Sequence, residues 1–303
     1  MKKAVVILGP TATGKTKLAI HLARKFPFEI ISADSMQFYK EMDIGTDKVS
    51  EHFRREIPHH LIDIITIEEE FSIADFKKLA IRKMNEIINR RKIPLIVGGS
   101  GLYIRAITEN FPVEESAPPN KPLRNKLENM EIEKLRELAF KIDANATSKI
   151  GKKDRKRLIR VIEFYNQTGR RISEVENKPP DFKFLKIGLI KRREILYRDI
   201  ENRIEEMFEE GFIDEVKHLK EKYSHWSKTA LQAIGYKEVS DFLNGKITID
   251  KAKEKMKLRT RHLAKRQITW FKREKNVIWI NSENFTNAVH QAETLVLQFL
   301  NAD

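Results

Sequence analysis

A glycine-rich segment near the N-terminus, Gly9–Thr16, has the spacing of a phosphate-binding loop. Its sequence, Gly-Pro-Thr-Ala-Thr-Gly-Lys-Thr, matches the pattern G-x-x-x-x-G-K-S/T at every position. In such loops the glycines let backbone N–H groups face phosphate oxygens, and the following helix adds partial positive charge. Lys15 would supply a full charge, and the Thr16 hydroxyl would supply a ligand for Mg²⁺. We therefore expect the whole loop to bind phosphate groups: Gly9, Pro10, Thr11, Ala12, Thr13, Gly14, Lys15 and Thr16.

A carboxylate, Asp34, follows the next apolar run, residues 28–32. A carboxylate at that place could bind a metal ion or accept a proton from an attacking nucleophile. It could equally cap a turn, and the residues alone do not decide between these roles.

A third apolar run, residues 93–97, ends in Gly98-Gly99-Ser100-Gly101 without an acidic residue. Phosphate loops are typical of ATP-binding proteins, in which an aspartate at the end of an apolar strand usually holds the metal. Its absence here suggests that the loop binds a diphosphate other than a nucleoside triphosphate.

The segments around these residues alternate between strand and helix patterns. Residues 4–8, 28–32 and 93–97 are short apolar runs typical of buried strands, and residues 71–90 have helical periodicity. Ser72 and Asp75 have the spacing of a capping box at the start of that helix. With the phosphate loop, this alternation predicts an α/β fold: a P-loop NTPase-like parallel sheet flanked by helices. Gly9, Asp34 and Gly98 should then meet at the carboxyl edge of the sheet.

Proline-rich stretches divide the chain into three parts. Residues 111–122 indicate a linker, residues 123–175 are helical and basic in pattern, and Pro179-Pro180 marks a second boundary. Strand-like runs return at residues 184–190 and 277–280. We therefore expect a core built from residues 1–115 and 183–303, with an all-helical insertion at 116–182.

Residues 195–222 are expected to form one long amphipathic helix that carries Arg203. An arginine there could neutralise a departing diphosphate, although a solvated surface position is the commoner situation.

The chain is strongly basic and contains no cysteine. It has 58 Lys and Arg against 44 Asp and Glu, a net charge of +14. Basic residues are clustered at 152–160 and 251–266, which favours a polyanionic partner such as nucleic acid over an evenly charged surface. The missing cysteines exclude disulfides and thiolate zinc sites and are compatible with a cytoplasmic location. No apolar run has the length of a membrane span, so we expect no membrane association.

The chain resembles the tRNA dimethylallyltransferase (tRNA isopentenyltransferase) family. The motifs that carry the resemblance follow the family's order over almost the whole chain: Gly9–Thr16, Asp34–Gln37 with Tyr39-Lys40, Met42–Thr46, Pro58–Asp63, Gly98–Tyr103, Ala233–Glu238 and Ala264–Phe271.

The resemblance implies transfer of a dimethylallyl group from dimethylallyl diphosphate to N6 of adenosine 37, beside the anticodon of tRNA. The phosphate loop would hold the donor's diphosphate with Mg²⁺ as cofactor, bound through Thr16. Lys15 and Thr16 would act on the leaving group, Asp34 matches the family's general base, and Arg203 matches an arginine near the diphosphate.

The resemblance also implies residues that contact the tRNA anticodon stem-loop. They are Asp34, Ser35, Met36 and Gln37; Ser100 and Arg124; Lys156, Arg157, Leu158, Ile159 and Arg160; Gln232, Ala233, Ile234, Gly235, Tyr236 and Lys237; and Lys265, Arg266 and Gln267. We expect a monomer. Three other functions stay open at this point: prenylation of free adenine nucleotides, a small-metabolite kinase, and a non-catalytic RNA-binding protein.

Overall fold

The computed structural model describes residues 1–110, 120–176 and 179–302, and it divides into two compact units. Unit 1 comprises Met1–Thr108 and Pro180–Asp303, and unit 2 comprises Glu109–Pro179. Most of the expected 111–122 linker lies outside the described residues. Its last two residues are not linker, because Lys121 and Pro122 begin helix α5 (Lys121–Glu128). Proline suits the first turn of a helix, where its missing N–H costs no hydrogen bond.

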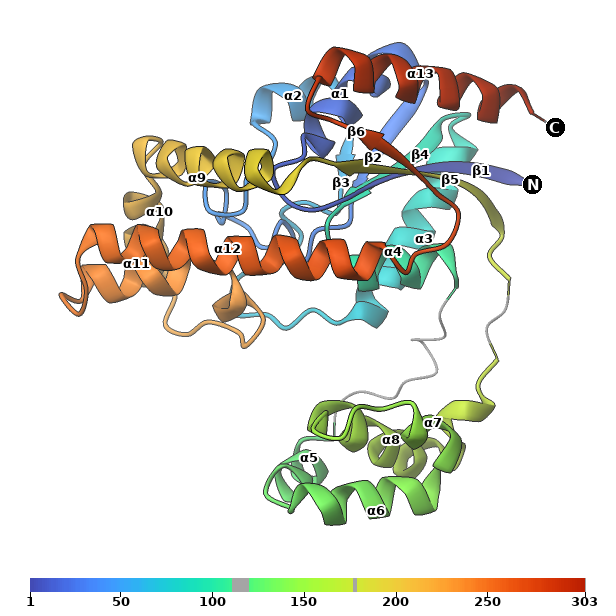
Figure 1. Ribbon diagram of the computed structural model, residues 1–303, viewed down its shortest axis with the longest axis vertical. Helices are drawn as coiled ribbons and strands as arrows, with labels where there is room; N and C mark the ends of the chain where they lie inside the picture. The colour runs from blue at the N-terminus through green and yellow to red at the C-terminus, as the bar shows by residue number, and fades with distance from the viewer. Residues whose placement is uncertain (111–119, 177–178, 303) are drawn as a thin grey trace. The chain divides into compact units, whose positions relative to one another are not determined.

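Unit 1 is built on a six-stranded parallel sheet (Figure 1). The strand order is β3-β2-β4-β1-β5-β6, with β1 and β4 at the centre. The strands are β1 (Lys2–Leu8), β2 (Phe28–Ser32), β3 (His59–His60), β4 (Ile93–Gly98), β5 (Phe182–Ile190) and β6 (Val277–Asn281). This architecture confirms the predicted fold class, an α/β sheet of the P-loop NTPase kind.

Helices cover both faces of this sheet (Figure 1). Alternate residues of β1 face opposite sides, so Val5 and Ile7 pack into one core and Val6 and Leu8 into the other. The first core includes α1 (Lys15–Lys25) and α13 (Phe285–Asn301). The second core includes α3 (Ile73–Asn89) and α4 (Gly101–Thr108), while the short α2 (Glu51–Glu56) precedes β3.

The start of α3 confirms the expected capping box. The Ser72 hydroxyl accepts the Asp75 N–H at 3.2 Å, and the Asp75 carboxylate accepts the Ser72 N–H at 3.0 Å. The local sequence thus fixes the first residue of this helix.

The expected single helix over residues 195–222 is wrong. The structure has two helices there, α9 (Arg193–Glu209) and α10 (Phe212–Lys222). Gly211 separates them with φ of 99°, a left-handed conformation that ends one helix and redirects the chain. The apolar periodicity continues across the break because both helices contribute to the same core.

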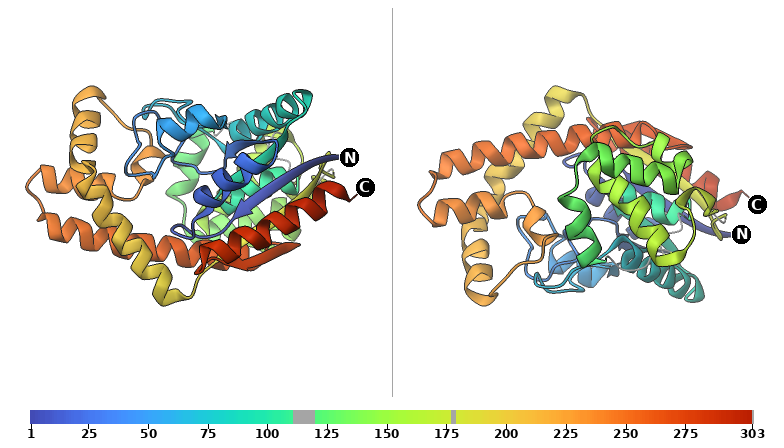
Figure 2. Two further views of the ribbon diagram at one scale, coloured as in Figure 1. Left: turned by 90° about the horizontal axis from the view of Figure 1, so that it is seen from above. Right: turned by 90° about the horizontal axis from the view of Figure 1, so that it is seen from below.

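That core is a third hydrophobic cluster, formed by helices beside the sheet. Its helices are α9, α10, the 3₁₀ turn η2 (Ala230–Gln232), α11 (Tyr236–Leu243) and the long α12 (Ile249–Phe271). In Figures 1 and 2 they gather at the end of unit 1 away from the chain termini. They carry Arg203 and Gln267, which reach the carboxyl edge of the sheet.

Unit 2 is all-helical over the residues that the structure describes. It contains α5, α6 (Ile132–Ile142), α7 (Ala144–Ser148), α8 (Arg155–Thr168) and the 3₁₀ turn η1 (Ile172–Glu174). Its core is formed mainly by Leu127, Leu135, Leu158 and Ile162. In neither unit, within the described ranges, does a helix have both the length and the apolar character needed to cross a bilayer.

Candidate active site

A cleft of about 1450 Å³ opens at the carboxyl edge of the sheet in unit 1. Gly9, Asp34 and Gly98 stand at the ends of the adjacent strands β1, β2 and β4, as the alternation predicts. The segments that line the cleft include the phosphate loop, the turn after β2, the turn after β4, and the inner faces of α9 and α12. The structure therefore brings Lys15, Thr16, Asp34, Ser100 and Arg203 to one cavity.

The phosphate loop is closed on itself by hydrogen bonds to one carbonyl. The Pro10 carbonyl accepts from the Thr13 hydroxyl at 2.8 Å and from Lys15 Nζ at 2.7 Å. Gly14, with φ of 86°, allows the turn into α1, whose first N–H groups then face the cleft. Gly9 has a different role: a Cβ there would lie 2.5 Å from the Leu189 carbonyl oxygen of the neighbouring strand.

Lys15 lies deep in the cleft and its charge is only partly compensated. Removal from water lowers its pKa to about 8, although the nearby Asp34 opposes that shift. Repulsion between the two cations contributes to this lowered pKa, because Arg203 also disfavours the charged form of Lys15. A bound diphosphate would relieve both effects, so this is a site that favours an anion.

Arg203 reaches the phosphate loop from α9. Its Nη1 donates to the Thr11 hydroxyl at 2.9 Å, and its Nη2 lies 3.1 Å from an Asp47 carboxylate oxygen. Its Nε is buried and has no hydrogen-bond partner among the residues that the structure describes, so the guanidinium keeps a free donor. The role beside the diphosphate that the family resemblance implies for this residue stays a prediction.

Asp34 lies opposite these cations at the end of β2. Its Oδ1 accepts the Met36 N–H at 2.9 Å, and its own N–H donates to the Ser32 hydroxyl at 3.3 Å. Burial raises its pKa above the ordinary value, although the Met36 N–H, Lys15 and Arg203 oppose that shift. A carboxylate of raised pKa is a stronger base and suits proton transfer.

Two glutamines expected to contact tRNA use their side-chain amides for hydrogen bonds within the protein. Gln267 accepts the Thr11 N–H and donates to the Gly99 carbonyl, both at 3.0 Å, and so joins the phosphate loop to the turn after β4. Gln37 accepts the Ser32 hydroxyl at 2.8 Å and donates to the Thr46 and Asp47 carbonyls at 3.3 and 3.1 Å. Both side chains therefore position other parts of the site.

The other residues of unit 1 expected to contact tRNA divide into two groups. One group lines the cleft: Ser35, Met36, Ser100, Gln232, Ala233, Ile234 and Arg266. In the other group, Lys237 and Lys265 are exposed, while Gly235 and Tyr236 are buried. Tyr236 donates its hydroxyl to Glu215 at 2.7 Å, so its side chain serves the packing of α10 and α11.

The basic segment 251–266 on α12 is partly neutralised within the fold. Lys253 and Lys257 pair with Glu205 at 2.5 and 2.6 Å, Arg261 pairs with Glu201, and Arg259 pairs with Glu238. The expected basic contact surface is therefore smaller there than the sequence suggests. Its exposed end is Lys265 and Arg266, beside the cleft.

In unit 2 the expected tRNA-binding residues have three environments. Lys156 and Arg157 are exposed at the start of α8. Arg124 and Arg160 both bind the fully buried Glu163, at 2.7 and 3.0 Å. The side chains of Leu158 and Ile159 are buried in the core of unit 2 and are not available to a ligand.

The cleft has few protein ligands for a metal ion. Among the described residues no group of three or more His, Cys, Asp or Glu side chains could hold one. The Thr16 hydroxyl lines the cleft next to Lys15. Magnesium in phosphate sites commonly takes one protein oxygen and completes its shell with phosphate and water oxygens, so this donor set fits Mg²⁺ bound with a diphosphate.

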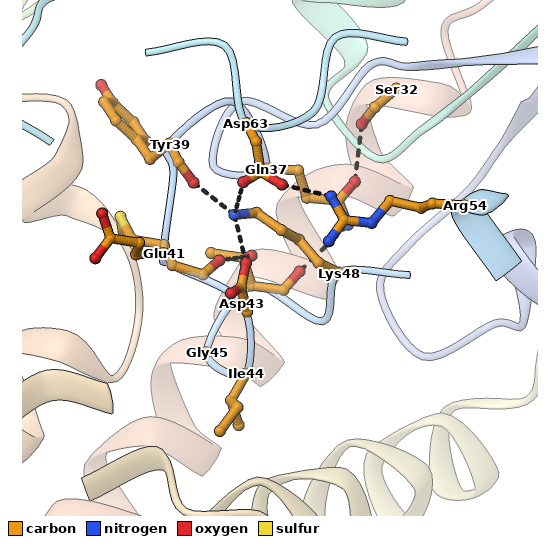
Figure 3. Close-up of polar contacts among 12 residues, drawn as sticks. Ser32, Gln37, Tyr39, Glu41, Asp43, Ile44, Gly45, Lys48, Arg54 and Asp63 are labelled. Atoms are coloured by element: carbon orange, nitrogen blue, oxygen red, sulfur yellow. Dashed lines mark hydrogen bonds and ion pairs between the residues drawn. The ribbon is translucent and has the colours of Figure 1, made fainter. Parts of the chain in front are cut away.

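Sequence reasoning missed a group of residues at the cleft wall, on the loop between β2 and α2. Asp47 pairs with Arg203, and the neighbouring Lys48 is buried among Asp43, Asp63 and the Tyr39 carbonyl (Figure 3). Their sequence neighbours, Met42–Thr46, were noticed only as a motif. Nothing in the spacing indicates that Lys48 turns inward, because its partners come from separate turns.

Comparison with known proteins identifies relatives that match this chain over nearly its whole length. The model of the family described as IPP transferase matches residues 37–274. The tRNA dimethylallyltransferase of Finegoldia magna is 44% identical over 94% of this chain and 92% of the relative, and that of Halothermothrix orenii is 45% identical over 91% and 87%.

Comparison with solved structures identifies transferases of the same kind. The tRNA isopentenylpyrophosphate transferase of Bacillus halodurans superposes with a TM-score of 0.75 at 36% identity, covering 99% of this chain and 97% of that one. A eukaryotic dimethylallyltransferase acting on tRNA gives a TM-score of 0.86 at 29% identity, covering 99% and 80%.

Proposed function

The chain belongs to the tRNA dimethylallyltransferase (IPP transferase) family, and from this membership we propose that it prenylates tRNA. The reaction transfers the dimethylallyl group of dimethylallyl diphosphate to N6 of adenosine 37, beside the anticodon. The products are N6-isopentenyladenosine and diphosphate. The observation that carries this proposal is one cleft that holds both a phosphate loop with Lys15 and a carboxylate of raised pKa, Asp34.

The donor's diphosphate would bind at the cationic end of the cleft. Lys15, Arg203 and the N–H groups at the start of α1 supply positive charge there, and the hydroxyls of Thr11 and Thr16 face the same cavity. When bound with the diphosphate, Mg²⁺ would neutralise part of its charge and so assist its departure. These groups stabilise charge that grows on the leaving oxygen as the bond to carbon breaks.

The adenosine would lie at the other end, with its exocyclic amine next to Asp34. The N6 lone pair forms the new bond to C1 of the dimethylallyl group while the C1–O bond breaks, and the electron pair leaves with diphosphate. The N6 proton passes to the Asp34 carboxylate. Because the exocyclic amine is a poor nucleophile, orientation of the two reactants in the cleft must supply much of the rate.

The base has to leave its stack to reach the cleft, as in other enzymes that modify bases. Exposed Arg266 and Lys265 near the cleft, and exposed Lys156 and Arg157 in unit 2, supply charge for the phosphates of an anticodon stem-loop. A free nucleotide would not need this basic surface, which favours tRNA over AMP as acceptor. We place the reaction in the cytoplasm and expect a monomer, which sedimentation would check.

The test is incubation of the protein with labelled dimethylallyl diphosphate, Mg²⁺ and a tRNA with adenosines at positions 36–38. We expect label at adenosine 37 alone, located by nuclease digestion. Parallel reactions contain AMP in place of tRNA, or ATP without a prenyl donor. Label in AMP in preference to tRNA, or ATP turnover without donor, would reject tRNA prenylation in favour of the other two enzyme classes. A folded protein that binds tRNA and transfers no label would be an RNA-binding protein only.

A further inference from the structure

We propose that Asp47 is a positioning residue, which holds Arg203 against the phosphate loop before the donor binds. The Arg203 guanidinium lies between two partners, the Thr11 hydroxyl at 2.9 Å and the Asp47 carboxylate at 3.1 Å. The first partner belongs to the phosphate loop, and the second to the loop that follows β2. The inference rests on the proposed function, because it takes Arg203 to face the diphosphate of the prenyl donor.

Arg203 needs a fixed partner because it shares the cleft with a second cation. Lys15 lies close enough for Arg203 to lower its pKa, so the two positive charges repel each other when no anion is bound. Arginine also has many rotamers, and a repelled guanidinium on a helix could turn toward solvent. Asp47 opposes both tendencies, since its carboxylate attracts the guanidinium and also raises the pKa of Lys15.

Asp47 can hold an arginine in place because the buried side chain of Lys48 fixes the loop that carries Asp47. The Lys48 side chain is only 2% exposed. Its ammonium donates to the Tyr39 carbonyl at 2.5 Å and contacts the carboxylates of Asp43 at 2.8 Å and Asp63 at 2.5 Å (Figure 3). Asp63 in turn binds Arg54 from α2. One buried ammonium thus ties together both ends of the 39–48 segment.

A second anchor comes from α10. The Glu215 carboxylate accepts the N–H groups of Asp43, Ile44 and Gly45 at 2.9, 2.6 and 3.2 Å, and a carboxylate bound by three backbone donors fixes the path of a loop. Gln37 donates to the Asp47 carbonyl itself at 3.1 Å. The backbone of Asp47 is therefore held, and only its short side chain is free to turn.

The same contacts join the two ends of the active site. Gln37 accepts from the Ser32 hydroxyl, which accepts the N–H of Asp34. Hydrogen bonds therefore link Asp34 through Ser32 and Gln37 to the Asp47 backbone carbonyl, and the Asp47 side chain continues the link to Arg203 and Thr11. Such an arrangement sets the distance between base and diphosphate site in advance, and preorganised charge of this kind lowers the barrier of the chemical step.

The test is a double-mutant cycle on Asp47 and Arg203, measured as kcat/KM for dimethylallyl diphosphate. Asp47 has a left-handed backbone with φ of 54°, so we choose Asp47→Gly, which removes the carboxylate without adding backbone strain. We expect Asp47→Gly to lower kcat/KM about tenfold in the wild-type background, within the range of coupled neighbours, and to change it little in Arg203→Ala. Asp47→Asn keeps an oxygen acceptor and tolerates the same φ, but it lacks the charge that attracts the guanidinium, so it should recover only part of the loss.

The matched control is Glu51→Gln on α2, close in sequence to Asp47. Glu51 is an exposed carboxylate on α2 that pairs with Arg55 at 2.9 Å. Its removal should leave kcat/KM near wild type in both backgrounds. Equal losses for Asp47→Gly with and without Arg203 would overturn the proposal, because the carboxylate would then act through something other than this contact.

Binding of inorganic pyrophosphate with Mg²⁺, followed by calorimetry, separates this inference from the proposed function. The same cycle can be measured by binding even if the wild-type protein transfers no label to tRNA, a result that would reject the function alone. We expect Asp47→Gly to weaken pyrophosphate binding in the wild-type background, and the double variant to bind no more weakly than Arg203→Ala. Tighter binding in Asp47→Gly would show that the carboxylate competes with the anion, and absence of binding to the wild type would remove the diphosphate site; either result overturns the positioning role.

Discussion

At the scale of single residues, the cleft keeps two charged groups under conditions that disfavour their charges. Burial lowers the pKa of Lys15 to about 8 and raises the pKa of Asp34. Within the described part of the chain neither group has an ion-pair partner at contact distance, and the Lys15 ammonium binds the neutral Pro10 carbonyl. Ligands that bind between these two residues would stabilise their charged forms: an anion next to Lys15, and a proton donor next to Asp34.

These two shifts predict a bell-shaped pH profile for kcat/KM, which reports the free enzyme. Asp34 acts as a base only when deprotonated, so activity should rise as the pH increases through its raised pKa. Lys15 binds diphosphate best when protonated, so activity should fall above about pH 8. Initial rates at subsaturating donor over the pH range would measure both limbs. An alkaline limb near the ordinary pKa of lysine would contradict the assigned environment of Lys15.

Replacement of Asp34 by asparagine should remove the base while keeping the shape of the turn. We expect the transfer rate to fall by about a hundredfold or more, as is typical for loss of a general base. Because the amide oxygen can still accept the Met36 N–H, stability and donor binding should change little. Single-turnover transfer, with tRNA and pyrophosphate binding as controls, measures this. Retained transfer would assign the proton to another acceptor.

At the scale of elements, local signals in the sequence predict those elements that local contacts determine. Ser72 and Asp75 specify the start of α3, and the phosphate loop specifies the junction of β1 and α1. The break at Gly211 was missed, since both helices on either side present apolar residues to one core. Gln37 and Gln267 were expected to contact tRNA from the family resemblance, and that contact stays a prediction. Their hydrogen bonds within the protein could not be predicted, because only the fold brings these partners near.

The contacts of the loop between β2 and α2 predict how a substitution there changes the free energy of unfolding. Lys48→Met would leave Asp43 and Asp63 without their shared cation, and loss of one member of a buried network is costly. Since Asp43 is half exposed, we expect a loss of about 2 kcal/mol in the free energy of unfolding, less than for a fully buried pair. Urea titration measures it. The matched variant Lys251→Met breaks an exposed pair with Glu254 and should cost at most about 0.5 kcal/mol, and an equal cost for both would contradict the network.

At the scale of the whole molecule, the net charge is +14, but many of the basic side chains are paired with acidic ones and others are not. On α12 much of the positive charge is neutralised by acids of α9 and α11, and in unit 2 Glu163 neutralises part of the charge of Arg124 and Arg160. The sequence could locate the basic segments, but it could not tell paired cations from free ones, because the pairing acids lie on other helices. The exposed cations at the start of α8 are therefore the best candidates for phosphate contacts.

Lys156→Ala combined with Arg157→Ala tests that surface. If both side chains bind phosphates, tRNA affinity should fall, and the slope of log K against log salt should become shallower by about one for each lost contact. Arg157 has a weak pair with Asp154 at 3.4 Å, which would not hold it against a phosphate. Binding titrations at several salt concentrations give the slope. Lys134→Ala, which removes an exposed cation of α6 paired with Glu131, is the matched control and should leave the slope unchanged. An unchanged slope in the double variant would make the start of α8 a solvated face, and tRNA would then depend on the cations beside the cleft.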